Sequence, residues 1–209
     1  MRITPKDRDI YKYIEKEGFA TVKQIGNIFF NDIIYKNELA KKRLNCLVEH
    51  GYVREVKSTN CNQHIFYSND KFKKQSYHNI VVMDLYSKFL EMRKVDVIKF
   101  EREKSWFGGK VISDAFITIS FNGKIQSYIV EVQASNNLWR KSIDKYADVN
   151  VLQEIVNQAG GVFPTMIFVD ELNHNLDGLG IPFPVAQIDM KLTDFPLVFD
   201  TNKWNEGDW

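Results

Sequence analysis

The sequence predicts an α+β protein built from a small helical head and a larger α/β domain. Short capped helices fill the first fifty residues, and segments rich in β-branched residues fill the second half. Residues 1–74 carry 15 Lys and Arg against 9 Asp and Glu, whereas residues 75–209 carry 13 against 18. Because the formal charge changes from +6 to −5, we expect the head to meet a polyanion and the second part to do so weakly at most.

The length and composition fit a globular chain. It has 209 residues, 44% of them hydrophobic and 13% aromatic, which is enough to build a core in one large domain or two small ones. No apolar run approaches the roughly 20 residues that span a bilayer, and no apolar leader follows Met1. Cys46 and Cys61 are too few for a disulfide framework. We therefore expect a soluble, cytoplasmic protein with reduced thiols and no membrane partner.

The first two helices are marked by their N-terminal caps. Thr4 and Asp7 have the spacing of a capping box, and Gly18 is a typical C-terminal stop. Thr21 and Gln24 form a second capping box at the start of the next helix. Two short helices are therefore predicted before residue 30.

A third helix and a hairpin complete the head. The helix begins near Asn37 and ends at Gly51, with an apolar stripe at Ala40, Leu44, Leu47 and Val48. Residues 52–56 and 64–67 then read as two short strands around a polar tip at residues 57–63. Three short helices followed by a hairpin predict a winged helix-turn-helix domain over residues 1–70.

The polar face of the third helix and the tip of the hairpin carry cations and amides. Cations suit phosphates, while amides and guanidinium groups suit base edges. The predicted DNA-binding residues are Lys36, Asn37, Lys41, Lys42, Arg43, Asn45, Lys57, Ser58, Asn60 and Gln63. The alternative is that the basic run at residues 41–43 is a solvated face. We expect double-stranded DNA as the partner, bound without a cofactor, and a homodimer where the site is palindromic.

The remainder reads as a connector at residues 71–78 and an α/β domain over residues 79–209. A helix over residues 79–93 is followed by a strand at 96–103, and later segments give a helix near Ile143 and Tyr146. Further strands are predicted at residues 111–119, 128–133, 165–170 and 185–189. The chain then ends in an acidic tail that contains Trp204 and Trp209.

Two of these strands each carry one carboxylate among apolar residues. Asp114 lies on the first and Glu131 on the second, and the turn dipeptide Asn122-Gly123 joins them in a hairpin. Burying a carboxylate inside an apolar strand costs roughly several kcal/mol, and a bound cation or another partner must offset this cost. Asp114 and Glu131 are therefore candidate metal ligands and catalytic residues, in the D…E-x-K layout of the PD-(D/E)xK nuclease-like fold. The alternative is two strand-end carboxylates that accept hydrogen bonds from loop amides.

Gln133 occupies the position where that layout has Lys. An amide orients a water molecule but carries no charge and is no general base. Lys141 or Lys145 on the following helix would supply the cation from another position, although a pair spaced i, i+4 is more often a solvated or phosphate-facing edge. A degraded domain used for dimerisation or DNA bending is as consistent with the sequence as a Mg²⁺-dependent nuclease.

The chain resembles the replication-relaxation family of plasmids and integrative elements, whose members join a winged-helix head to a PD-(D/E)xK-like domain. The resemblance covers residues 1 to about 170 and rests on the segments ITPKDRDI at 3–10, GFAT at 18–21, RLNCLVEHG at 43–51, HNIV at 78–81 and YIVE at 128–131, with Asp114 and residues 141–146. It implies DNA binding linked to plasmid replication, conjugal transfer or transcription control.

Three functions follow from these patterns. The first is a DNA-binding accessory or regulatory protein of a plasmid or mobile element, with a nuclease-like domain used for oligomerisation or partner contact. The second is a metal-dependent DNA endonuclease with Asp114 and Glu131 as Mg²⁺ ligands and Gln133, Lys141 or Lys145 assisting. The third is a module that recruits a relaxase or replication protein through the acidic second domain.

Overall fold

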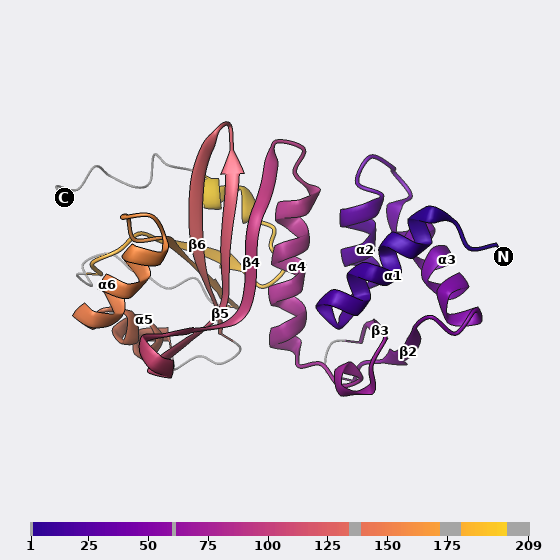
Figure 1. Cartoon of the computed structure of the whole chain (residues 1–209), viewed down its shortest axis with the longest axis horizontal. Coiled ribbons are helices and arrows are strands. Elements are labelled where there is room, and N and C mark those ends of the chain that lie inside the picture. Colours follow the sequence, from indigo (N-terminus) through magenta and orange to yellow (C-terminus); the bar gives the residue numbers. More distant parts are fainter. Residues whose placement is uncertain (1, 60–61, 134–138, 172–180, 200–209) are drawn as a thin grey trace. The chain divides into compact units, whose positions relative to one another are not determined.

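The chain divides into two compact units, Met1–Arg93 and Lys94–Trp209. The computed structural model describes residues 2–59, 62–133, 139–171 and 181–199 (Figure 1). The division lies after the long helix at residues 77–91, which the sequence had assigned to the second domain. That expected boundary near residue 70 is replaced by one at residue 93. The tail at residues 200–209, with Trp204 and Trp209, lies outside the described residues.

The first unit combines helices with a small antiparallel sheet. In chain order its elements are α1 (Pro5–Glu17), β1 (Phe19–Thr21), α2 (Val22–Phe29), α3 (Lys36–Glu49), β2 (Arg54–Lys57), β3 (His64–Tyr67), the 3-10 helix η1 (Asp70–Phe72) and α4 (Tyr77–Glu91). The strands are ordered β1-β3-β2. The three helices and the hairpin predicted for the head are present, and β1 is an additional strand.

Both predicted capping boxes are formed. Thr4 and Asp7 exchange hydrogen bonds at the start of α1, and Thr21 and Gln24 do so at the start of α2. Each pair satisfies donors that a helix N-terminus would otherwise leave without partners. The apolar faces of α1 and α2 pack against α3 and β3. The core between them contains Ile10, Ile14, Ala20, Ile25, Phe30, Ala40, Leu44, Leu47, Val53 and Phe66.

Polar contacts join α2 and α3 to α4. Asp84 of α4 accepts hydrogen bonds from Gln24 at 2.7 Å and from Lys23 at 2.9 Å. Asn27 donates to the hydroxyl of Ser87 at 3.2 Å. All of these side chains except Lys23 are buried, so each contact satisfies a group that would otherwise be desolvated without a partner. The helix α4 thereby fixes α2 within the first unit.

The second unit contains a mixed five-stranded sheet. Its elements are β4 (Val95–Trp106), the 3-10 helix η2 (Phe107–Gly109), β5 (Val111–Phe121), β6 (Lys124–Gln133), α5 (Trp139–Tyr146), α6 (Val149–Gln158), β7 (Thr165–Asp170), β8 (Val185–Asp189) and the 3-10 helix η3 (Phe195–Phe199). The order is β4-β5-β6-β7-β8, antiparallel from β4 to β6 and parallel from β6 to β8. Every predicted strand is present, and α6 is an element that the sequence had not predicted.

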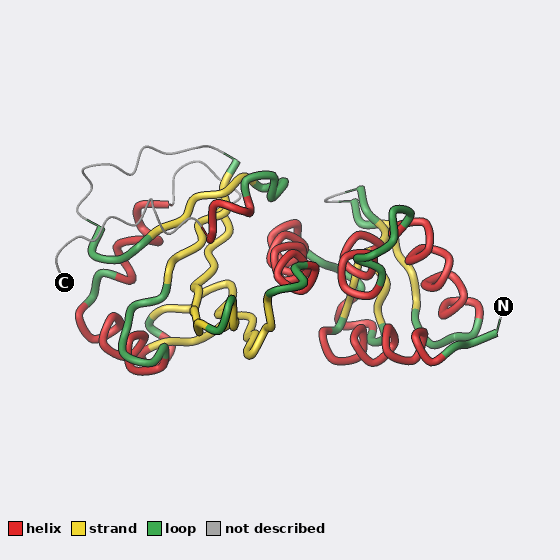
Figure 2. Tube along the Cα trace, turned by 90° about the horizontal axis from the view of Figure 1, so that it is seen from above, coloured by secondary structure: helices red, strands yellow, loops and turns green. Residues whose placement is uncertain are grey.

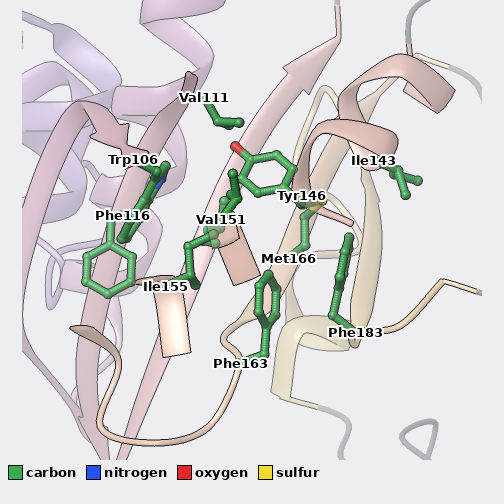
Figure 3. Close-up of a cluster of buried hydrophobic side chains, with 11 residues drawn as sticks. Trp106, Val111, Phe116, Ile143, Tyr146, Val151, Ile155, Phe163, Met166 and Phe183 are labelled. Atoms are coloured by element: carbon green, nitrogen blue, oxygen red, sulfur yellow. The ribbon is translucent and has the colours of Figure 1, made fainter. Parts of the chain in front are cut away.

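The β5–β6 hairpin turns where the sequence predicted it. Asn122 and Gly123 both have positive φ, 50° and 78°, which two-residue hairpin turns require. The parallel partner β7 is reached through α5 and α6, which lie on one face of the sheet (Figures 1 and 2). The core between these helices and the sheet contains Trp106, Phe116, Ile129, Tyr146, Ile155, Phe163, Met166 and Phe183 (Figure 3).

Replacing Asp7 tests the dependence of the first unit on one buried ion pair. Asp7 is fully buried and pairs with Arg43, so Asp7→Asn leaves a desolvated guanidinium without a countercharge. We expect the free energy of unfolding in urea to fall by about 3–5 kcal/mol. The matched control, Asp9→Asn, changes an exposed acid on the same helix and is expected to cost less than about 0.5 kcal/mol.

This prediction has a pH signature. Burial alone would raise the pKa of Asp7, but hydrogen bonds from Arg43 and Thr4 outweigh it and hold the pKa below its ordinary value. A lowered folded-state pKa gives stability that is present above the unfolded-state pKa and lost as the pH falls through the folded-state value. The wild type should therefore lose its advantage over Asp7→Asn only below about pH 4. An advantage that persists unchanged in acid would contradict the assignment.

Candidate functional site

One exposed surface in the first unit is formed by α3 and the β2–β3 hairpin. On α3 the residues Asn37, Lys41, Lys42 and Asn45 are exposed, while Ala40, Leu44 and Leu47 are buried. Asn37, Lys41 and Asn45 follow one another at i, i+4 spacing and therefore form one stripe. This arrangement agrees with the outward face that the sequence predicted for the helix.

Arg43 does not share this outward face. Its Nε donates to Asp7 Oδ1 at 2.6 Å, a second nitrogen donates to Asp7 Oδ2, and only 14% of the side chain is exposed. The same guanidinium donates to the backbone oxygen of Arg2 at 3.3 Å. Its place in the predicted DNA-binding set is corrected accordingly, because this cation joins α1 to α3.

Lys36 is also engaged within the first unit. Its ammonium group pairs with Glu91 of α4, and the side chain is about a quarter exposed. Hydrogen bonds from Lys36 and Lys88 lower the pKa of Glu91, against the opposing effect of its burial. Lys36 therefore has an acidic partner on α4, within the same unit.

The β2–β3 hairpin places further polar side chains beside α3. Lys57 is exposed and lies opposite His64 in the register, and the amide of Ser58 donates to the backbone oxygen of Gln63 at 2.8 Å. Asn60 of the predicted set lies outside the described residues. Lys57, Ser58 and Gln63 are thus carried on or next to a paired strand end.

A hollow of about 290 Å³ separates α3 from the hairpin. It is lined by Thr21, Val22, Lys23, Asn37, Lys41, Glu55, Gln63, His64 and Phe66. Asn37, Lys41 and Gln63 belong to the predicted set, while Glu55 and His64 were missed. The strand alternation would have revealed them, because Glu55 and Lys57 share a face of β2, as His64 and Phe66 do on β3.

A second candidate site is a polar cluster inside the second unit. Asp114 and Glu131 lie on the adjacent strands β5 and β6, one position beyond the register pair Ala115–Val130. Glu131 and Gln133 alternate with Val132 on β6 and therefore share the face that carries Ile129, the face packed against α5 and α6. Glu131 is only 4% exposed, so its carboxyl group depends on protein partners.

Both carboxyl groups have protein hydrogen-bond donors. The amide of Val132 donates to Asp114 Oδ2 at 2.7 Å, and the hydroxyl of Tyr146 donates to Glu131 Oε1. Figure 3 shows the Tyr146 hydroxyl directed away from the neighbouring rings of Phe163 and Phe183. Burial first, and then the charge and hydrogen bond of Glu131, raise the pKa of Tyr146 well above its ordinary value. The phenol therefore keeps its proton and remains a donor.

The residues around this pair add amide and carboxylate groups. Gln133 lies opposite Asp170 of β7 in the register, and both are buried. Lys141 and Lys145 are exposed on α5, whereas Ile143 and Tyr146 are on its buried side. The helix thus turns its two lysines away from the side that delivers Tyr146 to Glu131.

The donor set matches a divalent cation in chemical kind. Carboxylate and amide oxygens are the ligands that Mg²⁺ prefers. Within the described parts of the chain, however, no three His, Cys, Asp or Glu side chains are grouped so that they could hold a metal ion. Asp114 and Glu131 form a hydrogen-bonded cluster in this geometry.

Comparisons with protein-family models, with curated proteins and with solved structures find no match for this chain. None of the helices in the described ranges has the length and apolar character needed to cross a bilayer.

The Tyr146–Glu131 hydrogen bond can be tested by stability measurements. Tyr146→Phe leaves a buried carboxylate without one donor, so we expect the free energy of unfolding to fall by about 1–3 kcal/mol. Tyr11→Phe is the matched control for the change at neutral pH, because the hydroxyl of Tyr11 bonds to Glu15 at the surface. A raised folded-state pKa gives stability that is lost as the pH rises above the unfolded-state value, about 10 for Tyr. Above about pH 10 the Tyr146→Phe variant should therefore lose stability less steeply than the wild type. If the free energy of unfolding of the variant and of the wild type fell equally with pH in this range, the assignment would be wrong.

Proposed function

We propose that the chain is a sequence-specific DNA-binding protein that reads duplex DNA with α3 and the β2–β3 hairpin. The observation that carries the proposal is the exposed stripe Asn37, Lys41 and Asn45, next to Lys42 and beside a hairpin with Lys57. Cations next to amides are the combination that binds phosphates and base edges together. An α-helix fits into the major groove of B-form DNA.

The topology of the first unit supports this function. Its order is helix, strand, helix, helix, strand, strand, with the strands arranged β1-β3-β2. This order from α1 to β3 agrees with the one expected of a winged helix-turn-helix, and we propose α3 as its recognition helix and the β2–β3 hairpin as its wing. Residues 1–93 also carry 17 Lys and Arg against 11 Asp and Glu, so the net charge of +6 belongs to this unit.

The second unit is proposed to be a PD-(D/E)xK-like domain that does not cleave DNA. The antiparallel strands β4 to β6, the helices and the parallel strand β7 follow the order of that fold. Gln133 contributes no charge, and Tyr146 donates to the carboxylate of Glu131. With its net charge of −5, such a domain suits oligomerisation or contact with a protein partner such as a relaxase or replication protein better than phosphate binding.

The biological setting is proposed from the family resemblance. A DNA reader joined to an inactive nuclease-like domain fits an accessory or regulatory protein of a plasmid or mobile element. Replication, conjugal transfer and transcription control each require occupation of a defined DNA site. A map of where the protein sits on the DNA of its own element would test this setting directly.

The recognition surface predicts a specific loss of DNA affinity. Lys41→Ala with Lys42→Ala removes two exposed cations from α3 and should weaken duplex binding. The slope of log affinity against log salt should fall by about 2, since each lost phosphate contact removes about 0.9. Lys12→Ala with Lys16→Ala removes the same charge from exposed positions on α1 and serves as the control. Equal affinity and slope in the two double variants, measured by fluorescence anisotropy, would refute the surface assignment.

A metal-dependent endonuclease is the second candidate, favoured by the shared face of Asp114, Glu131 and Gln133. If the pair binds a cation, Mn²⁺ should stabilise the fold by about 1–3 kcal/mol at saturating excess. Asp114→Asn should abolish that gain and any Mn²⁺-dependent cleavage of duplex, nicked or branched DNA. The proposed inactive domain predicts no shift in melting temperature and no cleavage. A shift together with cleavage would reverse the assignment.

A further inference from the structure

The surface assigned to DNA binding contains one acid that a purely phosphate-binding surface would not need. Glu55 of β2 lines the hollow beside α3 together with Lys41 and Asn37. In the register it lies opposite Phe66, which is buried in the core of the first unit. Directly opposed residues point to the same face of a sheet, so Glu55 is on the face toward the helices.

The orientation of Glu55 is set by a neighbour on β3. The ring nitrogen Nδ1 of His64 lies 2.6 Å from Glu55 Oε1, and both side chains are partly exposed, by 48% for His64 and 32% for Glu55. An ionised carboxylate only accepts hydrogen bonds, so Nδ1 of His64 must carry the hydrogen. One carboxylate oxygen is thereby occupied, and the other retains its capacity to accept.

The charges around the hollow explain how an acid is tolerated there. Lys41 and Lys23 line the same hollow, and Lys57 follows Glu55 on the same face of β2. Lys23 is already paired with Asp84 at 2.9 Å. Glu55 therefore stands among cations that attract DNA, while its own charge repels any phosphate that approaches it.

We propose that Glu55 is a specificity-determining residue that accepts a hydrogen bond from an exocyclic amino group of a base. In the major groove only cytosine N4 and adenine N6 present such donors. A carboxylate at this place favours an amino-bearing base and penalises guanine O6 and thymine O4, which are acceptors. His64 is a positioning residue, because it acts through Glu55. This inference rests on the proposed DNA-binding function.

The test begins with selection of binding sites from a random duplex pool by the full chain. Affinities are then measured for the best site and for its single-base variants. We expect one position that prefers cytosine or adenine, and Glu55→Gln should reduce that preference about tenfold. The amide of Gln presents a donor toward the base once its oxygen accepts from His64. Affinity for random duplex should rise, because a negative charge has been removed from the surface.

Three further variants separate the roles. Asp9→Asn removes one exposed acid from α1 and should leave both the base preference and the affinity for random duplex unchanged. His64→Ala should lower the base preference while the affinity for random duplex stays constant, and His64→Asn, which retains a donor near the position of Nδ1, should restore it. If Glu55→Gln has the same base preference as the unaltered chain, the inference is wrong and DNA binding is unaffected. Failure of the unaltered chain to bind any duplex overturns both.

Discussion

The cost of placing a carboxylate out of contact with water governs both units. Such a group is stable only when a cation or hydrogen-bond donors replace its hydration. Burying an unpaired ion costs roughly several kcal/mol of desolvation. Asp7 accepts hydrogen bonds from Arg43 and from the cap of α1. Asp84 accepts from Gln24 and Lys23, and Glu131 accepts from the hydroxyl of Tyr146. The Asp7–Arg43, Asp84–Gln24 and Glu131–Tyr146 contacts join residues 36, 60 and 15 positions apart, so polar satisfaction and tertiary structure depend on each other.

In the first unit this constraint decides which cations stay exposed on α3, the surface proposed to bind DNA. Arg43 lies in the basic run at residues 41–43, yet it pairs with Asp7 and so connects α3 to α1. Lys36 forms an ion pair with Glu91 and so connects α3 to α4. The cations that stay exposed on α3 are therefore few, and each acid beside them changes the local potential appreciably. A negative charge at Glu55 therefore changes the potential of this surface more than it would on a uniformly basic one, which is the basis of its proposed role.

Local signals in the sequence predicted the elements well, and long-range contacts escaped it. Capping boxes lie within four residues, so Thr4 and Thr21 placed two helix starts correctly. The strand β1 is only three residues long and exists because β3 pairs with it, which a local pattern does not reveal. The membership of α4 in the first unit likewise depends on Asp84 meeting α2. For the candidate sites, spacing placed Asp114, Glu131 and Gln133 on neighbouring strands, but the partner Tyr146 was read only as part of an apolar stripe.

The same constraint bears on whether the second unit can hydrolyse DNA. The amide of Val132 donates to Asp114 and the hydroxyl of Tyr146 donates to Glu131, so each carboxylate is already stabilised by a hydrogen bond before any cation binds. Hydrolysis further needs a positive group near the attacked phosphate, and Gln133 is neutral while Lys141 and Lys145 are turned to the exposed side of α5. The hydrogen-bonded carboxylates and the lack of a charge at position 133 both support the proposed inactive domain, and restoring a lysine at position 133 alone would change only the second of these features.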